Sequence, residues 1–502
     1  MFTPRTPIRS AGLLLIAALT LAACTERQQV YDIEGLGQIR FGNSGAAEAQ
    51  EAFHRGVLWL HSFEYGFAEE EFQRAQSLDS TMVLAYWGEA MTHNHPLWRQ
   101  TDPEAAQAVL AKLAPTPEAR RALAPTEREA LYLDAVEALY GEGDKQERDR
   151  RYSEALGRLH EAHPDDDEAR AFYALSILGL TNGVRDYATY ERAASIVEPL
   201  FERNPRHPGA AHYIIHSYDD PDHAELGLEA ANAYADIAPG AGHAQHMTTH
   251  IFLALGMWDR VIENNILATK TIVSQRGEQD PAPWACGHYT SWQHYGHLQK
   301  GEFAEAETLM DACQAWVDAQ GGPSGGAGNY WSSMRAHHLL DAGDPSLIAR
   351  WSGDPAAGRS PTAGEGWPDS RVRVYATDAV VRMRAGEQVD VTSLLATIPD
   401  EPAGNRIMKL QVEGLAALQG GRTEEGLARL TEAADMEDAL PLEFGPPEIP
   451  KPSRELLAEA LADAGRLGEA RQALEVTQAR IPGRRAAAVL GSAAQMVADN
   501  LE

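Results

Sequence analysis

One short stretch constrains the fold of this chain more than any other feature. Residues 53–79 read FHRGVLWLHSFEYGFAEEEFQRAQSLD, with small residues at Gly56 and Ala68 and seam-filling residues at Phe72 and Ala75. Small side chains at the first two positions let two antiparallel helices cross closely, and the other two fill the seam on the following turns. The stretch therefore predicts a two-helix hairpin.

The second half of this pattern recurs along the chain, as an alanine, an apolar residue four positions later and a small or apolar residue three positions after that. The copies are Ala155/Leu159/Ala162, Ala193/Val197/Leu200, Ala224/Leu228/Ala231 and Ala306/Met310/Cys313, with weaker copies near Val261, Gly426 and Ala470. A repeated unit that cannot bury its apolar face alone stacks on its neighbours. We expect an all-α fold over residues 46–502, a right-handed superhelical solenoid of hairpins resembling tetratricopeptide repeats (TPR).

The beginning of the chain is typical of an exported protein. Arg5 and Arg9 precede an apolar run, and Leu-Ala-Ala-Cys then ends at Cys24. These four residues resemble the lipobox of bacterial lipoproteins, in which the cysteine is lipidated, and the following Thr25 favours the outer membrane facing the periplasm. We therefore expect a signal peptide over residues 1–24, a tether over 25–45 and a lipid-anchored protein of the cell envelope. An ordinary cleaved signal or an uncleaved anchor are the alternatives.

Charge and missing motifs exclude several functions. The chain has 43 Lys and Arg against 73 Asp and Glu, a formal net charge of -30, so it should repel nucleic acid. It contains no His-Glu-x-x-His and no dinucleotide-binding glycine run, which are signatures of common hydrolases and dehydrogenases, and its one Gly-x-Ser-x-Gly match, GPSGG at 322–326, lies in a glycine-rich loop. Whether the protein is an enzyme stays open.

A resemblance covers most of the expected mature chain. The runs GAAHYIIHSYDD (209–220) and APGAGHAQHMTTHIF (238–252) resemble a group of exported bacterial TPR proteins with His-Tyr-x-x-His and His-x-x-His-Met-x-x-His-Ile motifs. The segments LAYWGEAMTHNHPLW (84–98) and KPSRELLAEALADAGR (451–466) fit the same group. The resemblance implies the repeat fold and export, and it implies no particular activity.

Those two runs hold five of the eighteen histidines. On a helix, the spacing i, i+3 and i+7 of His243, His246 and His250 keeps the three side chains within an arc of about 60°. A second stripe forms from His212, His216 and Asp219, at i, i+4 and i+7, if the helix continues that far.

Both stripes precede a second-helix signature, so they lie on first helices, which line the concave face of such solenoids. Neighbouring first helices lie about 8–10 Å apart, close enough for imidazoles from both to share an ion. The first helix of the next hairpin, in the stretch CGHYTSWQHYGH, places His288 at the same position of the repeat as His243. The predicted metal-binding residues are His212, His216, Asp219, His243, His246, His250 and His288.

Neutral imidazoles beside a carboxylate favour a transition metal, with Zn first and Cu or Fe as alternatives. Seven donors exceed the need of one tetrahedral ion, so two ions share the site, some histidines orient others, or some bind substrate. The leading interpretation is a lipid-anchored TPR protein with one or two metal ions in a concave histidine cluster. Competing interpretations are a hydrogen-bonded lining, pH-dependent partner binding, and a non-catalytic scaffold that holds peptides or envelope proteins in its groove.

Two cysteines remain after Cys24. Cys286 begins the first helix of one hairpin and Cys313 closes the second, so both lie at the same end of the pair. A disulfide there is compatible with an oxidising compartment, and two free packing cysteines are the alternative.

Three loops interrupt the repeats, at 321–328, 352–369 and 442–453. The last of these is the segment that we expect to fold over the inner face.

Overall fold

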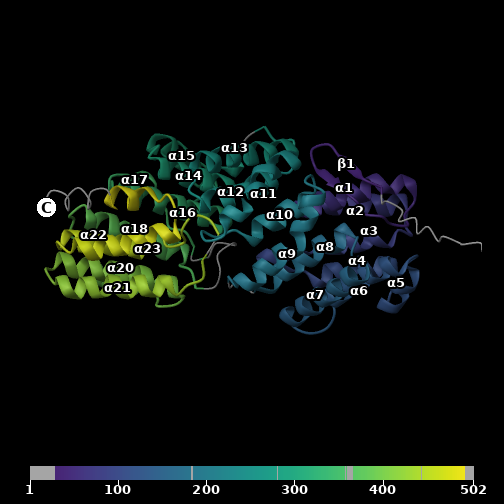
Figure 1. Ribbon diagram of the computed structural model, residues 1–502. Helices are drawn as coiled ribbons and strands as arrows, with labels where there is room; N and C mark the ends of the chain where they lie inside the picture. Colours follow the sequence, from purple (N-terminus) through teal and green to yellow (C-terminus); the bar gives the residue numbers. More distant parts are fainter. Residues whose placement is uncertain are drawn as a thin grey trace, which may run out of the picture.

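The computed structural model describes residues 29–181, 185–279, 281–356, 358, 366–442 and 444–491. The expected signal peptide and lipobox, Cys24 included, lie outside this part of the chain. Helical hairpins follow one another along an elongated stack, from the purple and blue helices α1 to α9 to the green and yellow helices α18 to α23 (Figure 1). The predicted all-α hairpin solenoid is confirmed.

The chain forms short strands, α-helices and single turns of 3-10 helix. The strands are β1 (Tyr31–Ile33), β2 (Gly37–Ile39), β3 (Asn94–His95) and β4 (Gln100–Thr101). The helices of the N-terminal half are α1 (Gln50–His61), α2 (Tyr65–Leu78), α3 (Val83–Met91), α4 (Pro103–Leu113), α5 (Pro117–Leu123), α6 (Glu127–Leu139), α7 (Lys145–Ala162), α8 (Asp167–Leu178), α9 (Tyr187–Arg203), α10 (Pro208–Ser217) and α11 (Ala224–Ile237). The others are α12 (Gly242–Ala254), α13 (Trp258–Gln275), α14 (His288–Lys300), α15 (Phe303–Ala319), α16 (Gly325–Ala342), α17 (Leu347–Arg350), α18 (Ser370–Arg384), α19 (Val391–Thr397), α20 (Ala403–Gln419), α21 (Thr423–Asp438), α22 (Ser453–Asp463) and α23 (Leu467–Arg480).

The repeated sequence pattern marks second helices. Its copies lie on α2, α7, α9, α11, α13, α15, α21 and α23, and each of these packs against the helix before it. In the first hairpin the ring of Phe72 lies where side chains at Gly56 and Gly88 would otherwise be, since a Cβ at Gly88 would come within 2.3 Å of that ring. Close approach at small residues thus holds α1, α2 and α3 together, as the sequence indicated.

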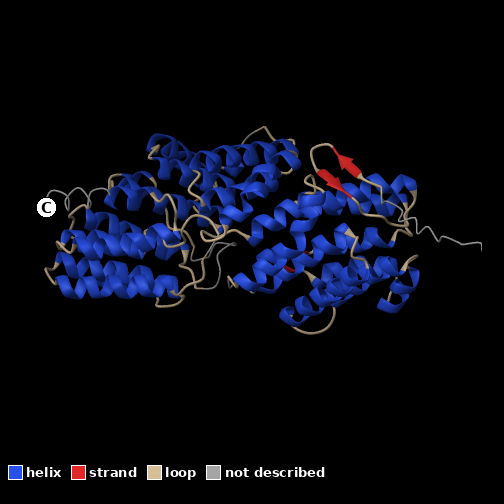
Figure 2. Cartoon of the chain, viewed as in Figure 1, coloured by secondary structure: helices blue, strands red, loops and turns tan. Residues whose placement is uncertain are grey.

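Residues 31–41 differ from the tether that we expected over 25–45. Strands β1 and β2 pair antiparallel, with Tyr31 opposite Ile39, and lie beside the N-terminal helices (Figure 2). The backbone N–H of Gln38 donates to the carbonyl of Arg206 at 2.9 Å, and Phe41 is fully buried. The apolar side chains of this segment are the physical reason, because burying them stabilises a docked hairpin over a free linker.

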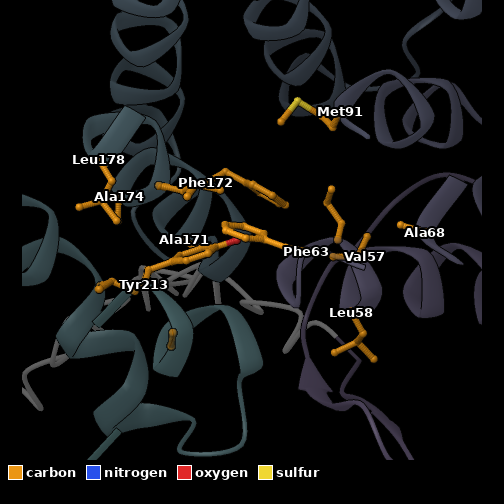
Figure 3. Packing of buried hydrophobic residues seen from close by; sticks show 14 of the residues in the cluster. Val57, Leu58, Phe63, Ala68, Met91, Ala171, Phe172, Ala174, Leu178 and Tyr213 are labelled. Atoms are coloured by element: carbon orange, nitrogen blue, oxygen red, sulfur yellow. The ribbon is translucent and has the colours of Figure 1, made fainter. Parts of the chain in front are cut away.

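The N-terminal helices close onto the middle of the stack. Helix α1 packs against α10, and Phe63, at a left-handed φ of 55°, carries its ring to within 4.3 Å of the His212 ring, centroid to centroid. Figure 3 shows the side chains of Phe63, Phe172 and Tyr213 gathered in this region. Every residue of α10 is buried, so its histidines lie inside the protein rather than on an exposed surface.

Two of the three expected loops are described in full or nearly so. The first is shorter than predicted, because α16 already begins at Gly325. The segment after α21 follows the expectation, since Leu442 and Phe444 lie over the histidine-bearing helices α10 and α12 and line the same pocket as the histidines.

Candidate metal centre

Six of the seven predicted metal ligands form two groups of three, and in each group one nitrogen per ring lies within 4.8 Å of the other two. Site A consists of His212, His216 and His243, and site B consists of His246, His250 and His288. Each site joins two histidines four residues apart on one first helix to a histidine at the start of the next first helix. The repeat therefore builds the same arrangement twice, with α10 and α12 in site A and α12 and α14 in site B.

Site B has both of its paired histidines fixed in one tautomer. The Nδ1–H of His250 donates to the Asp219 carboxylate at 2.5 Å, and the Nδ1–H of His246 donates to the Asn265 side-chain oxygen at 2.7 Å. The Asn265 amide is itself oriented, because its Nδ2 donates to the carbonyl of Val261 at 2.8 Å. In a neutral imidazole with a protonated Nδ1, Nε2 carries a lone pair.

The two Nε2 atoms of His246 and His250 lie 3.2 Å apart. Two lone pairs that face each other with no proton between them repel unless a cation lies between them or one ring is protonated. Two nitrogens on a tetrahedral Zn ion, each at about 2.05 Å, lie ~3.3 Å apart. The observed separation therefore suits a shared metal ion.

Site A repeats the spacing of the two nitrogens, but a hydrogen bond fixes the tautomer of only one of its paired histidines. The Nδ1–H of His212 donates to the backbone carbonyl of His61 at 2.7 Å, which leaves a lone pair on its Nε2. The Nε2 of His216 lies 3.1 Å away. The orienting acceptor is here a main-chain atom, supplied by the end of α1.

The third histidine of each site also has a free nitrogen. The Nε2 of His243 and the Nδ1 of His288 are buried and have no hydrogen-bond partner among the described residues. An unsatisfied buried polar atom is rare in a native fold and calls for a ligand or water. The two sites adjoin each other, because the ring centroids of His216 and His250 are 6.0 Å apart and those of His243 and His246 are 6.2 Å apart.

Burial keeps these imidazoles neutral. It lowers the pKa of His212 and of His288 to about 3, and it lowers the pKa of His216, His243 and His246 well below the ordinary value. Neutral imidazole is the form that binds metal, so no proton has to leave at neutral pH.

Asp219 is not part of either group, so of the two roles that the sequence allows it, a metal ligand or a residue that orients a ligand, the structure favours the second. Helix α10 ends at Ser217, so the i+7 position leaves the helical face. The carboxylate instead accepts the hydrogen bond of His250 and orients that ring. The expected single stripe on α12 is also divided, since His243 joins the histidines of α10.

A third cluster, missed by the sequence, joins His61, Glu168 and His207. His207 accepts at Nδ1 from the N–H of Ala210, so its Nε2–H donates to Glu168 at 3.1 Å. His61 lies 2.6 Å from the other carboxylate oxygen and 2.8 Å from the Tyr213 hydroxyl. Every side-chain nitrogen and oxygen of this cluster has a partner without an ion, and it is a structural network that ties α1 to α8 and α10. Its members come from distant segments, and the only local signal is a histidine before Pro208.

Both sites open onto one pocket of about 1010 Å³ of empty space, solvent at its mouth included. His216, His243, His250 and His288 all line it. The rest of its lining is mostly apolar and aromatic and includes two cations, Arg99 and Arg185; the apolar and aromatic members are Leu97, Trp98, Leu178, Tyr190, Trp292, Leu442 and Phe444.

The two remaining cysteines are joined. Cys286 and Cys313 form a disulfide with their Cα atoms 4.7 Å apart, at the end of the α14–α15 hairpin. The bridge fixes the turn that leads into α14, which begins with His288.

No family model and no curated protein matches the chain. Among solved structures it is similar to the Cut9–Hcn1 hetero-tetramer of the APC/C, at 12% identity over 90% of this chain and 78% of that one, with a TM-score of 0.31. It is also similar to yeast Tom70, at 10% identity over 90% and 89% of the two chains, with a TM-score of 0.32. The TPR domain of P58(IPK) is similar at 12% identity over 91% and 99%, with a TM-score of 0.22. Similarity at this level says nothing about function.

Proposed function

We propose that this protein binds two transition-metal ions, one in site A and one in site B. The observation that supports this most directly is the pair of Nε2 atoms of His246 and His250, 3.2 Å apart, with both Nδ1 atoms already donating elsewhere. Two facing lone pairs suit a metal ion between them, whereas in a hydrogen-bonded lining one of the two rings has to be protonated.

Three neutral imidazoles per ion favour Zn, and Cu or Fe suit the same donors. Three protein ligands would leave a further coordination position on each ion, and histidines of both sites line the pocket from which a water or substrate could reach it. In such open sites the metal lowers the pKa of a bound water, which makes metal-assisted attack of that water on a polar bond the reaction to test first.

The metal content of the purified protein tests the proposal. Elemental analysis without chelator should find close to two ions per chain. Since the sites use different histidines, His216→Ala and His246→Ala should each leave about one ion, and the double variant should bind none.

His160→Ala, which changes a histidine of α7 outside both sites, is the control and should keep both ions. Circular dichroism must show the native helix content for every variant. A folded wild-type protein that stays metal-free after incubation with Zn, Cu and Fe would contradict the proposal and leave the scaffold interpretation, in which the pocket holds a peptide or an envelope protein.

We also propose that the protein is a lipoprotein of the cell envelope, anchored through Cys24 and facing the periplasm. The sequence pattern around Cys24 supports this. In the part of the chain that the structure describes, no helix is long and apolar enough to cross a membrane. Cys24→Ala should move the protein from the membrane pellet to the soluble fraction, and a variant that still pellets after a salt wash would contradict the lipid anchor.

A further inference from the structure

The pocket beside the two metal sites contains one buried cation whose hydrogen-bonding capacity is only partly used. The side chain of Arg185 is 5% exposed. Its Nη2 donates to Asp220 at 2.6 Å and to the carbonyl of Ser217 at 3.3 Å. Within the described part of the chain, its Nε and Nη1 have no hydrogen-bond partner.

Aromatic rings hold this guanidinium in place. Its carbon lies 4.2 Å from the ring centroid of Tyr190 and 5.2 Å from that of Phe444. Stacking on two rings satisfies the face of the guanidinium and leaves its in-plane N–H groups without acceptors. A buried donor without an acceptor destabilises the fold, so an acceptor from outside the chain is the expected partner.

The charge of the loaded site points to the same chemistry. The six histidines of sites A and B are neutral ligands, so two divalent ions keep their full charge. The two nearby carboxylates are already engaged, Asp219 by His250 and Asp220 by Arg185 and by His223. An anion that enters the metal-loaded pocket would therefore meet uncompensated positive charge.

Apart from Arg99 and Thr181, the remaining walls are apolar or aromatic. Trp98, Trp292 and Phe444 line the pocket together with Leu97 and Leu442. Trp292 lies closest to the metal sites, with its ring centroid 4.5 Å from that of His250. Rings of this kind bind a flat apolar body rather than a strongly hydrated ion.

We propose that the pocket binds a small aromatic carboxylate, with the carboxylate on Arg185 and the aromatic body between Trp98, Trp292 and Phe444, in front of the two metal sites. This inference rests on the proposed metal binding, because the ions supply most of the positive charge.

Phenylacetate and its neutral isostere phenylacetamide test the inference by calorimetric titration of the metal-loaded full chain. Phenylacetate should bind at least about tenfold more tightly, since a hydrogen bond to a charged group contributes ~1.5–3 kcal/mol. Arg185→Met combined with Asp220→Asn should remove that preference. The asparagine keeps the oxygen that accepts from the N–H groups of residues 222 and 223, so the double change leaves no buried charge without a partner.

Two further variants test the contact with the aromatic part of the ligand and provide a control. Phe444→Ala removes an aromatic wall on a side chain that is 39% exposed, and it should weaken phenylacetate and phenylacetamide alike. Arg192→Met is the matched control, because Arg192 is an exposed arginine of α9 that also lies over a tyrosine, Tyr173 at 5.9 Å, but does not line the pocket, and it should change neither affinity.

The outcomes distinguish this inference from the proposed function. A metal-free protein refutes both. A protein with two ions that binds phenylacetate no better than phenylacetamide refutes only the aromatic carboxylate site. Preferential binding that survives the double variant also refutes it, because the carboxylate would then coordinate the metal without Arg185.

Discussion

Asp219→Asn tests whether the proposed metal site B depends on a residue that is not itself a ligand. Asp219 is 6% exposed, and its carboxylate lies 2.5 Å from the Nδ1 of His250 in site B. The charge-assisted hydrogen bond fixes the tautomer of His250 and makes its Nε2 a stronger donor to a metal.

The expected loss follows from the type of bond. A hydrogen bond to a charged group contributes ~1.5–3 kcal/mol and a neutral one about 1 kcal/mol, so the asparagine should remove about 0.5–2 kcal/mol of binding free energy. That is about a two- to thirtyfold weaker affinity at site B. Site A should be unaffected, because its His212 is oriented by the backbone carbonyl of His61.

The assay isolates site B. In the His216→Ala background, one ion per chain should remain, and its affinity can be measured by competition with a chromogenic chelator. Asp222→Asn, on the same loop but exposed, is the control and should leave the affinity unchanged. If Asp219→Asn binds the ion as tightly as its parent while the fold is intact, Asp219 does not orient a metal ligand and our reading of site B is wrong.

Other expectations concern stability and covalent structure. Gly88→Ala should lower the free energy of unfolding by about 1–3 kcal/mol through overpacking, whereas Gly66→Ala, whose Cβ meets nothing within 4 Å, should change it little; urea denaturation compares them. In the metal-free protein, His212 has a pKa of about 3 when folded and about 6.5 when unfolded, so stability is fully present above pH 6.5 and falls as the pH falls toward 3. At pH 5, His212 should account for about 2 kcal/mol of the lost stability, and this part of the loss should be missing in His212→Gln. Urea denaturation at pH 7 and pH 5 measures it, and urea midpoints that fall equally in the two proteins would contradict the assignment. Thiol titration of the unfolded, unreduced protein should find neither Cys286 nor Cys313 free, and two thiols would contradict the disulfide.

The sequence alone determined the hairpins and the pairs of histidines four residues apart. Both depend on contacts within one helix or between consecutive helices, and a period of 3.6 residues defines the face on which they lie. That is why Ala224 and Ala306 marked second helices, and why His212 with His216, and His246 with His250, were expected to act together.

Only the tertiary structure decided which histidines meet. The helical period gives the direction in which a side chain points around the helix axis. It does not give the position along that axis at which a neighbouring helix packs. His243 shares a stripe with His246 in the sequence, yet it lies beside His212 because the start of α12 packs against α10. For the same reason His288, at the start of α14, completes site B.

The partners that orient the ligands were equally beyond the sequence. Asn265 lies on the second helix of the same hairpin as His246, and His61 is about 150 residues before His212 in the chain and approaches it only because the N-terminal helices close onto α10. Asp219 was found as a neighbour of the site, but its role depended on α10 ending at Ser217. Long-range packing, rather than local pattern, thus decided which nitrogens are left with free lone pairs, and so where a metal ion can bind.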